Sequence, residues 1–485
     1  MGGRLLSLRA IASRGFFWGM LSTGLLFSSA YAEETEKPQV DRKRIHVLDR
    51  PNLYQSPSVK TPTPKHWFQE PHDWGSGTLT GDWAGFRNTL GDHGVAFGIR
   101  YVSISSGNMT GGLDRGFYGG QPIGVTVTVD TESLFNWPGG TVFFDWEFFD
   151  WYNNAYPPPA GFDPTGSYVG SNTNVIDRSE KIIYEIAQLY IRQSFFEEAV
   201  AIEFGKMDSN LIFSAIDAAG GFQNNISMYT STLNPFFPTY PNESTAALLQ
   251  LSPFDFFELS AALFDGTLSS YNPITGTPQR SPFGSSPVTF FENQGFWFVI
   301  AQADFRWGLG TDRPGELSVG GWVQTGLTAT AGTDKNGVRD VHGFYLDWDQ
   351  TIWSTGASNA SEGGGVRFFG QFGWSDPDKN PVNWSLMSGF SATGILPNRM
   401  ADAIGVMGAY SKFTGDPAIY QSVFASGAPG AAGGSEASFE LFYILQATPF
   451  LAIQPGFLWM RTPGGGEPAP LGNATTLYIL FTINL

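Results

Sequence analysis

Two carboxylates on one extended segment are the residues of this sequence with the clearest potential for chemistry. Asp145 and Glu147 lie two positions apart in VFFDWEFFD, so both side chains project from the same face of a strand. Two carboxyl groups that flank a glycosidic bond are the machinery of a glycosidase. Acids that line the watery interior of a barrel explain the same pattern, and no other acid/base group supports catalysis. We therefore predict that the protein is not an enzyme.

The motifs of cofactor-dependent and metal-dependent enzymes are missing from the sequence. It contains no cysteine, no Walker-type phosphate loop, no His-Glu-x-x-His pair and no Gly-x-Ser-x-Gly turn. The histidines are scattered, without the spacing of metal ligands. They are His46, His66, His72, His93 and His342. We predict that the protein uses no cofactor and holds no metal.

An alternation with a period of two residues dominates the sequence from residue 94 onward. In residues 125–130, valines alternate with threonines and an aspartate, and in residues 477–485 every second side chain is large and apolar. One apolar face and one mixed polar face are typical of strands that meet water on one side only. Sixteen segments show this pattern: 94–105, 121–133, 139–151, 181–195, 198–206, 245–252, 256–265, 295–307, 315–329, 341–352, 363–376, 382–392, 401–412, 437–447, 450–461 and 474–485.

The connections between these segments alternate in length. The short ones are 196–197, 253–255, 308–314 and 448–449, and the long ones, rich in Gly, Pro, Asn and Ser, are 152–180, 207–244, 266–294 and 413–436. This layout predicts an all-β fold: a transmembrane outer-membrane β-barrel of about 16 antiparallel strands, with short periplasmic turns and long extracellular loops. A secreted β-sandwich or propeller shares the period. It does not need the tryptophans that have outward parity here, which are Trp146, Trp297, Trp307, Trp374 and Trp459.

The alternate positions whose side chains point into the barrel, which have inward parity, carry charges of both signs and several amides. The candidates for the pore lining and for sugar contact are Arg100, Asp145, Glu147, Gln188, Arg192, Gln302, Arg306 and Arg367. Such a wall offers donors and acceptors that replace the hydration shell of a neutral polyol without trapping it. Inward aromatic residues, among them Trp322, Tyr345 and Phe369, could stack on sugar rings. Ordinary filling of the lumen explains most of these positions equally well.

The composition of the 485-residue chain points in the same direction. Only 15 % of the residues are charged, against about 25 % in a typical soluble protein, and 15 % are aromatic. With 27 Lys and Arg against 44 Asp and Glu, the formal net charge is −17. A nucleic-acid partner is therefore not expected.

The N-terminus predicts export through the Sec pathway. Three arginines within the first 14 residues precede an uncharged apolar run at 15–29, and a small-x-small cleavage site ends at Ala32. An uncleaved N-terminal anchor is the competing interpretation. We predict a signal peptide at 1–32 cleaved after Ala32, a Pro-rich flexible periplasmic extension at 33–73, and the β-barrel at 74–485.

Several segments resemble the carbohydrate-selective porins of the OprB family. The resemblance begins with LTGDWAGFR at 79–87 and includes LYIRQSFFEEAVAIEFGKMDSN at 189–210. It continues with NWPGGT at 136–141, FELSAALFDG at 257–266, FYLDWDQTIW at 344–353, GVRFFGQFGWSDPDKNPVNW at 365–384 and ELFYILQATPFLAIQPGFLW at 440–459. We single out five residues of these motifs as family-motif residues: Asp82, Trp83, Arg87, Lys206 and Asp208. The resemblance implies a sixteen-stranded porin through which glucose and related sugars diffuse passively, with long loops folded in to narrow the channel.

The resemblance also implies a location and partners. We expect the outer membrane of a Gram-negative bacterium, with its lipids and lipopolysaccharide around the barrel, a mono- or disaccharide as substrate, and the outer-membrane assembly machinery as a partner. A homotrimer is an expectation that the strand count allows. Two features depart from the family pattern: the sequence ends in Leu485 where an aromatic residue is usual, and the 33–73 extension is long.

Two alternatives to a sugar porin remain open at this point. Removal of the three signal-peptide arginines leaves a net charge of −20, which would suit a general or cation-leaning diffusion porin. A secreted β-rich protein that binds or cleaves carbohydrate is the alternative from a different class. The family-motif residues also have two interpretations, because Arg87, Lys206 and Asp208 can stabilise the barrel without touching sugar.

Overall fold

The computed structural model describes residues 77–153, 169–171, 182–240, 243–266, 290–291, 295–328, 338–355, 364–417, 419–420, 432–465 and 471–485. All of them belong to the second of two compact units, which spans residues 45–485. The predicted signal peptide (1–32) and extension (33–73) lie outside the described residues. Within the described residues, none of the helices has the length and hydropathy that a membrane span requires.

Strands make up almost all of the regular structure. They are β1 (Val95–Gly112), β2 (Gly116–Gly120), β3 (Ile123–Asp130), β4 (Gly140–Asn153), β5 (Ile182–Phe195), β6 (Val200–Met207), β7 (Ser244–Phe254), β8 (Phe257–Asp265), β9 (Trp297–Trp307), β10 (Gly315–Thr328), β11 (Val338–Ser354), β12 (Gly365–Ser375), β13 (Val382–Thr393), β14 (Ala403–Phe413), β15 (Ser435–Thr448), β16 (Leu451–Arg461) and β17 (Gly472–Asn484). The helices are short: α1 (Phe86–Asp92), α2 (Thr131–Phe135), η2 (Ser209–Leu211), η3 (Asp217–Ala219), η4 (Asn225–Ser227) and η6 (Pro463–Gly465).

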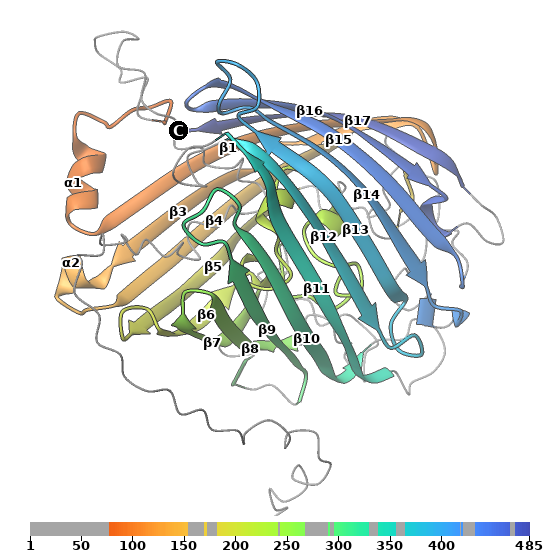
Figure 1. Ribbon diagram of the computed structural model, residues 1–485, viewed down its shortest axis with the longest axis horizontal. Helices are drawn as coiled ribbons and strands as arrows, with labels where there is room; N and C mark the ends of the chain where they lie inside the picture. Colours follow the sequence, from red (N-terminus) through yellow and green to blue (C-terminus); the bar gives the residue numbers. More distant parts are fainter. Residues whose placement is uncertain are drawn as a thin grey trace, which may run out of the picture. The chain divides into compact units, whose positions relative to one another are not determined.

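The sheet closes into a barrel because its first strand pairs with its last (Figure 1). β1 pairs with β17 from Arg100↔Asn484 to Gly112↔Gly472, and with β3 on its other side. From β3 to β17 each strand pairs antiparallel with the next along the chain. β2 pairs with β1 and β4, the same neighbours as those of β3. Pro122, which has no N–H for a ladder hydrogen bond, lies between β2 and β3 and interrupts the ladder there. They act as one strand, so the prediction of 16 antiparallel strands is confirmed.

The strand faces alternate between buried and exposed as the sequence predicts. In β9, Phe298, Ile300 and Gln302 are buried inside the barrel, whereas Val299 and Phe305 are exposed outside. Exposed large apolar residues also form a belt around the end where the short turns lie: Phe135, Trp137, Phe195, Phe196, Phe254, Phe256, Trp307, Leu309, Ile352, Trp353, Leu396 and Met400. An outward apolar band with aromatic residues at its edge is the surface that lipid covers on a membrane barrel.

The segment before β1 is held against the last strand. Arg87 Nη2 donates to the main-chain oxygen of Leu485 at 2.6 Å, and its guanidinium carbon lies 4.6 and 4.9 Å from the ring centroids of Trp83 and Phe97. The carboxylate of Asp82 accepts hydrogen bonds from the backbone and side-chain nitrogens of Asn88 at 3.0 and 2.9 Å. Three family-motif residues therefore organise the junction between the first and last strands.

We expect Arg87→Gln to lower the free energy of unfolding by about 1–3 kcal/mol, because it removes a charge-assisted hydrogen bond and two cation–π contacts. The measurement is the temperature at which the folded band disappears on SDS gels. Arg313→Gln is the matched control, since Arg313 is exposed on the turn between β9 and β10. An unchanged transition in Arg87→Gln would show that the junction does not limit stability.

The turn between β13 and β14 is built around a buried carboxylate. Asp402 accepts hydrogen bonds from Arg399 Nε and Nη2 at 2.8 and 2.7 Å, from the hydroxyl of Tyr443, and from the backbone N–H of Gln446 at 3.0 Å. Burial by itself would raise the pKa of Asp402, but these hydrogen bonds, with that of Arg399 the largest, outweigh burial and hold the pKa below its usual value.

This depressed pKa predicts an acid-sensitive contribution to stability. A carboxyl group with a lowered pKa stabilises the folded state above its unfolded pKa of about 3.9, and that stabilisation is lost as the pH falls through the folded value. We expect Asp402→Asn to be about 1–3 kcal/mol less stable at pH 7 and nearly equal to the wild type at pH 2. Urea unfolding in detergent at both pH values measures this, and Asp255→Asn, on the exposed turn before β8, is the control. A deficit that does not shrink with acid would contradict the assignment.

Candidate pore constriction

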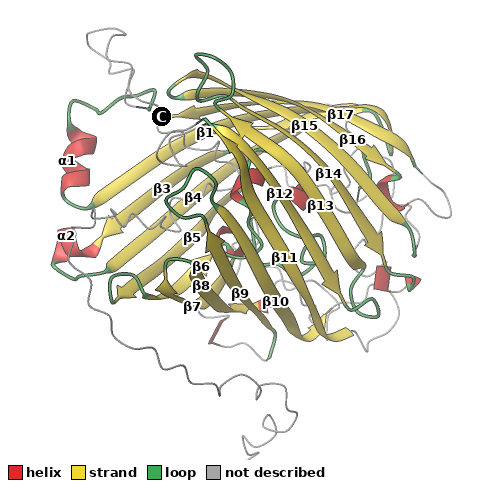
Figure 2. Ribbon diagram, in the orientation of Figure 1, coloured by secondary structure: helices red, strands yellow, loops and turns green. Residues whose placement is uncertain are grey.

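The connection between β6 and β7 folds into the barrel. We call its described residues 208–240 the constriction loop; Figure 2 shows its short helices inside the ring of strands. Hydrogen bonds join this loop to inward-facing side chains of seven strands, β9 and β11 to β16: Gln302, Asp349, Gln371, Ser385, Ser411, Glu440 and Gln454. The loop therefore crosses the lumen from β6 to the opposite wall and narrows it.

Two family-motif residues fix the base of the constriction loop. Asp208 accepts a hydrogen bond from the backbone N–H of Asn210 at 2.9 Å and so starts η2. Lys206 is buried at the end of β6, where its Nζ donates to the main-chain oxygen of Ile186 at 2.7 Å. It also lies 3.5 Å from the carboxylate of Glu185 and 3.9 Å from that of Glu243. Lys206 and Asp208 thus position the loop.

The far part of the loop is held on β15 and β16. Glu440 accepts hydrogen bonds from the backbone N–H groups of Gln223 and Asn224 at 2.7 and 3.0 Å, and from the hydroxyl of Tyr478 at 2.7 Å. The side-chain amide of Gln454 donates to Gly221 O at 2.6 Å. A carboxylate that accepts three hydrogen bonds in a buried site is a strong attachment.

Some of the predicted lumen residues lie beneath the loop. Gln302 accepts from the backbone N–H of Ser214 at 3.0 Å and from the hydroxyl of Tyr345 at 2.7 Å, so it positions the loop. Phe369 packs against Phe222 and Trp322 against Phe236, with ring centroids 5.6 and 5.8 Å apart. The suggestion that inward aromatics stack on sugar is therefore wrong for Trp322, Tyr345 and Phe369, which the loop covers.

Another group of candidates lies together on β1, β4 and β5. Asp145 faces Gln188, whose amide donates to it at 3.4 Å, and the charge of Arg100 acts on Asp145. Glu147 points inward on the same strand as Asp145. Both acids are buried in the polar wall of the barrel. Their inward orientation agrees with the predicted parity.

Three arginines on the short-turn side of the loop are paired with carboxylates of neighbouring strands. Arg192 donates to Glu203 at 2.5 Å and to Glu198 at 2.8 Å, with Gln250 as a further acceptor. These pairs sit on the wall formed by β5, β6 and β7. They hold a long side chain flat against the wall, so only 13 % of the Arg192 side chain is exposed.

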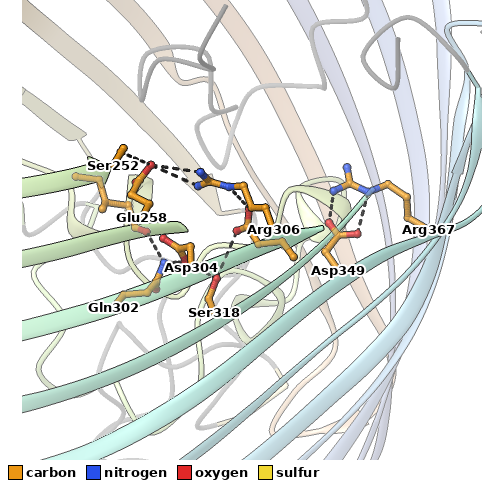
Figure 3. A network of polar contacts seen from close by, with 10 residues as sticks. Ser252, Glu258, Gln302, Asp304, Arg306, Ser318, Asp349 and Arg367 are labelled. Atoms are coloured by element: carbon orange, nitrogen blue, oxygen red, sulfur yellow. Dashed lines mark hydrogen bonds and ion pairs between the residues drawn. The ribbon is translucent and has the colours of Figure 1, made fainter. Parts of the chain in front are cut away.

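The other two arginines are shown in Figure 3. Arg306 donates through Nε to Glu316 at 2.8 Å and through both Nη atoms to Glu258 at 3.4 and 3.5 Å. Arg367 donates through Nε and Nη2 to the two oxygens of Asp349. The sequence analysis missed the three carboxylates. The inward parity could have found them, because Glu316, Glu258 and Asp349 lie two positions from inward Ser318, Ser260 and Asp347.

Comparison with known proteins shows to which family the chain belongs. The family model described as "Carbohydrate-selective porin, OprB family" matches residues 116–483. The chain belongs to this family. Porin B of Pseudomonas aeruginosa is 26 % identical to this OprB-family chain over 149 residues, which are 30 % of this chain and 31 % of Porin B. The chain thus matches about a third of the length of that relative.

Solved structures agree on the fold of this OprB-family chain. A high-pH structure of Pseudomonas putida OprB superposes with a TM-score of 0.67 at 19 % identity, and covers 84 % of this chain and 99 % of that one. A low-pH structure of the same protein gives 0.52 at 15 % identity, with the same coverage. The family and the fold are those of channels rather than of enzymes.

Proposed function

We propose that the protein is an outer-membrane porin through which glucose and related sugars diffuse passively into the periplasm. The observation that carries this proposal is the constriction loop, which crosses the lumen of a closed barrel in a chain of the carbohydrate-selective family. The wall beside the loop presents charged donors and acceptors of both signs. Such a passage strips and replaces the hydration of a neutral polyol without binding it tightly.

The location and partners form part of the same proposal. A Sec signal peptide cleaved after Ala32 would deliver the chain to the periplasm, where the assembly machinery inserts it among outer-membrane lipids and lipopolysaccharide. The outward apolar band supports a membrane environment. Residues 33–73 would remain a flexible periplasmic extension, and the barrel would form a homotrimer. Arg100, Asp145, Glu147, Gln188, Arg192, Arg306 and Arg367 remain the pore-lining candidates.

Single-channel recording in a planar bilayer tests the proposal. We expect a steady open-channel current that glucose reduces in a saturable way at fixed salt concentration. A pore that glucose does not affect would be a general diffusion porin. Folded protein that forms no channel would refute the transport function and leave the secreted β-rich protein.

A further inference from the structure

The outward faces of β13 to β17 carry only two charged side chains, and both are cations. Every residue of these five strands is described, and their two carboxylates, Glu436 and Glu440, are buried. The outward cations are Lys412, the last but one residue of β14, and Arg461, the last residue of β16. Both therefore lie at the end of the barrel that carries the long connections.

The strand register places the two cations on either side of a patch of small side chains. Lys412 pairs with Ser435 of β15. Two residues further along β15, Ala437 pairs with Tyr410 of β14 and with Arg461 of β16. From the spacing of strands and the rise per residue, the Cα atoms of Lys412 and Arg461 are about 12 Å apart. Two long basic side chains at this separation can reach one phosphate group that lies over Ser435 and Ala437.

Neither cation forms an ion pair with a carboxylate of the described residues. Nζ of Lys412 donates to the main-chain oxygen of Gly433 at 2.5 Å, which leaves two of its three N–H groups for another acceptor. Arg461 is exposed. Asp416, the first carboxylate after β14, accepts a hydrogen bond from the backbone N–H of Ile419 at 3.3 Å. Cations at a membrane surface attract anionic lipid headgroups.

Aromatic side chains border the same patch. Trp384 of β13 is the cross-strand partner of Lys412, and its ring centroid lies 5.0 Å from that of Tyr410. One row nearer the middle of the barrel wall, Phe439 of β15 pairs with Trp459 of β16. Tryptophan and tyrosine concentrate at the level of lipid headgroups, so the patch lies where headgroups meet the barrel.

We propose that Lys412 and Arg461 bind the phosphate of an anionic glycolipid in the outer leaflet of the membrane. Both side chains donate to phosphate oxygens, while Ser435 and Ala437 leave room for the headgroup between them. The acyl chains lie along the apolar outward face of β14 to β16. Lipopolysaccharide, whose lipid A part is a phosphorylated and acylated sugar, has this chemistry. The inference rests on the proposed outer-membrane location and gives the lipid a defined site on the barrel.

Titration of the detergent-solubilised protein with lipid A, followed by native mass spectrometry, tests the site. We expect Lys412→Gln and Arg461→Gln each to raise the Kd for lipid A about fivefold, and the double variant about 25-fold, because each loses the attraction of one cation to the headgroup. Lipid A without its phosphates is expected to bind the wild type as weakly as intact lipid A binds the double variant. Lys379→Gln is the matched control, since Lys379 lies at the same end of the barrel but pairs with Asp376 at 3.8 Å.

A charge-conserving variant separates lost attraction from a disturbed fold. Lys412→Arg combined with Arg461→Lys keeps both charges, so we expect its Kd to stay within about threefold of the wild-type value. A double glutamine variant that binds lipid A as tightly as the wild type would overturn the proposal, as would equal binding of lipid A with and without phosphates.

The channel properties keep this proposal distinct from that of sugar diffusion. Because Lys412 and Arg461 face outward, the double glutamine variant is expected to keep the sugar-free conductance and the glucose block of the wild type. A wild-type channel that glucose does not block would refute the proposed sugar diffusion alone.

Discussion

Gly373→Leu is expected to displace the constriction loop and to raise the single-channel conductance on the order of two- to fivefold, because a sixteen-stranded barrel without an inward loop is a wide aqueous channel. Gly373 faces inward on β12, directly beneath the loop. A Cβ at this position would lie 1.8 Å from Thr230 Oγ1 and 2.8 Å from Thr232 Oγ1. Both threonines belong to the loop, so a large side chain at Gly373 and the seated loop exclude each other.

Conductance in salt without sugar is the measurement, followed by glucose block of the same channels. The displaced loop no longer narrows the lumen, so we expect glucose block to weaken as conductance rises. Gly408→Leu is the matched control, since Gly408 faces outward on β14 and a Cβ there meets only Ser438 O, at 3.9 Å. Unchanged conductance in folded Gly373→Leu would show that the loop is not the constriction.

The barrel could be predicted from sequence because its signals are local. Alternation within each strand depends only on which side faces lipid and which faces water, and each of the sixteen predicted segments overlaps a strand of the structure. The interruption at Pro122, the extension of β1 to Gly112 and the helices α1 and α2 were not predicted. In each of these segments, apolar and polar residues do not alternate regularly. Contacts with neighbouring segments, such as the pairing of β1 with β17 and β2, determine the structure there.

The constriction could not be predicted because its contacts are distant in sequence. Glu440 holds Gln223 across 217 positions, and no pattern near either residue signals the pair. Parity placed Arg306 and Arg367 inside the barrel alike. It could not show that Arg306 donates hydrogen bonds to two carboxylates and Arg367 to one. That difference comes from acidic residues on three other strands. Nor could parity show that the loop covers Tyr345 and Phe369.

Lys206→Met is expected to lower the free energy of unfolding by about 3 kcal/mol at pH 8, because removal of one member of a buried ion pair leaves the opposite charge uncompensated. Two buried carboxylates, Glu185 and Glu243, lose their cation at once. The partly exposed pair of Lys379 and Asp376, 3.8 Å apart, provides the control. We expect Lys379→Met to change stability by less than about 1 kcal/mol.

The destabilisation by Lys206→Met should depend on pH with a definite sign. Burial raises the pKa of Glu243, Glu185 raises it further, and Lys206 opposes both. Without Lys206 the pKa of Glu243 rises again. A carboxyl group with a raised pKa loses its contribution to stability as the pH rises through the folded value, so the deficit of the variant should be larger at pH 8 than at pH 5.

A second substitution distinguishes lost charge compensation from lost packing. Lys206→Met combined with Glu243→Gln removes one of the two carboxylates, so we expect it to recover part of the stability at pH 8 and to flatten the pH dependence. Urea unfolding of the single and double variants measures this, and a double variant no more stable than Lys206→Met would assign the loss to packing. Because Lys206 joins β6 to β5 and to the residue before β7, its loss loosens both ends of the constriction loop. Sugar-free conductance of the single variant should therefore fluctuate more than that of the wild type.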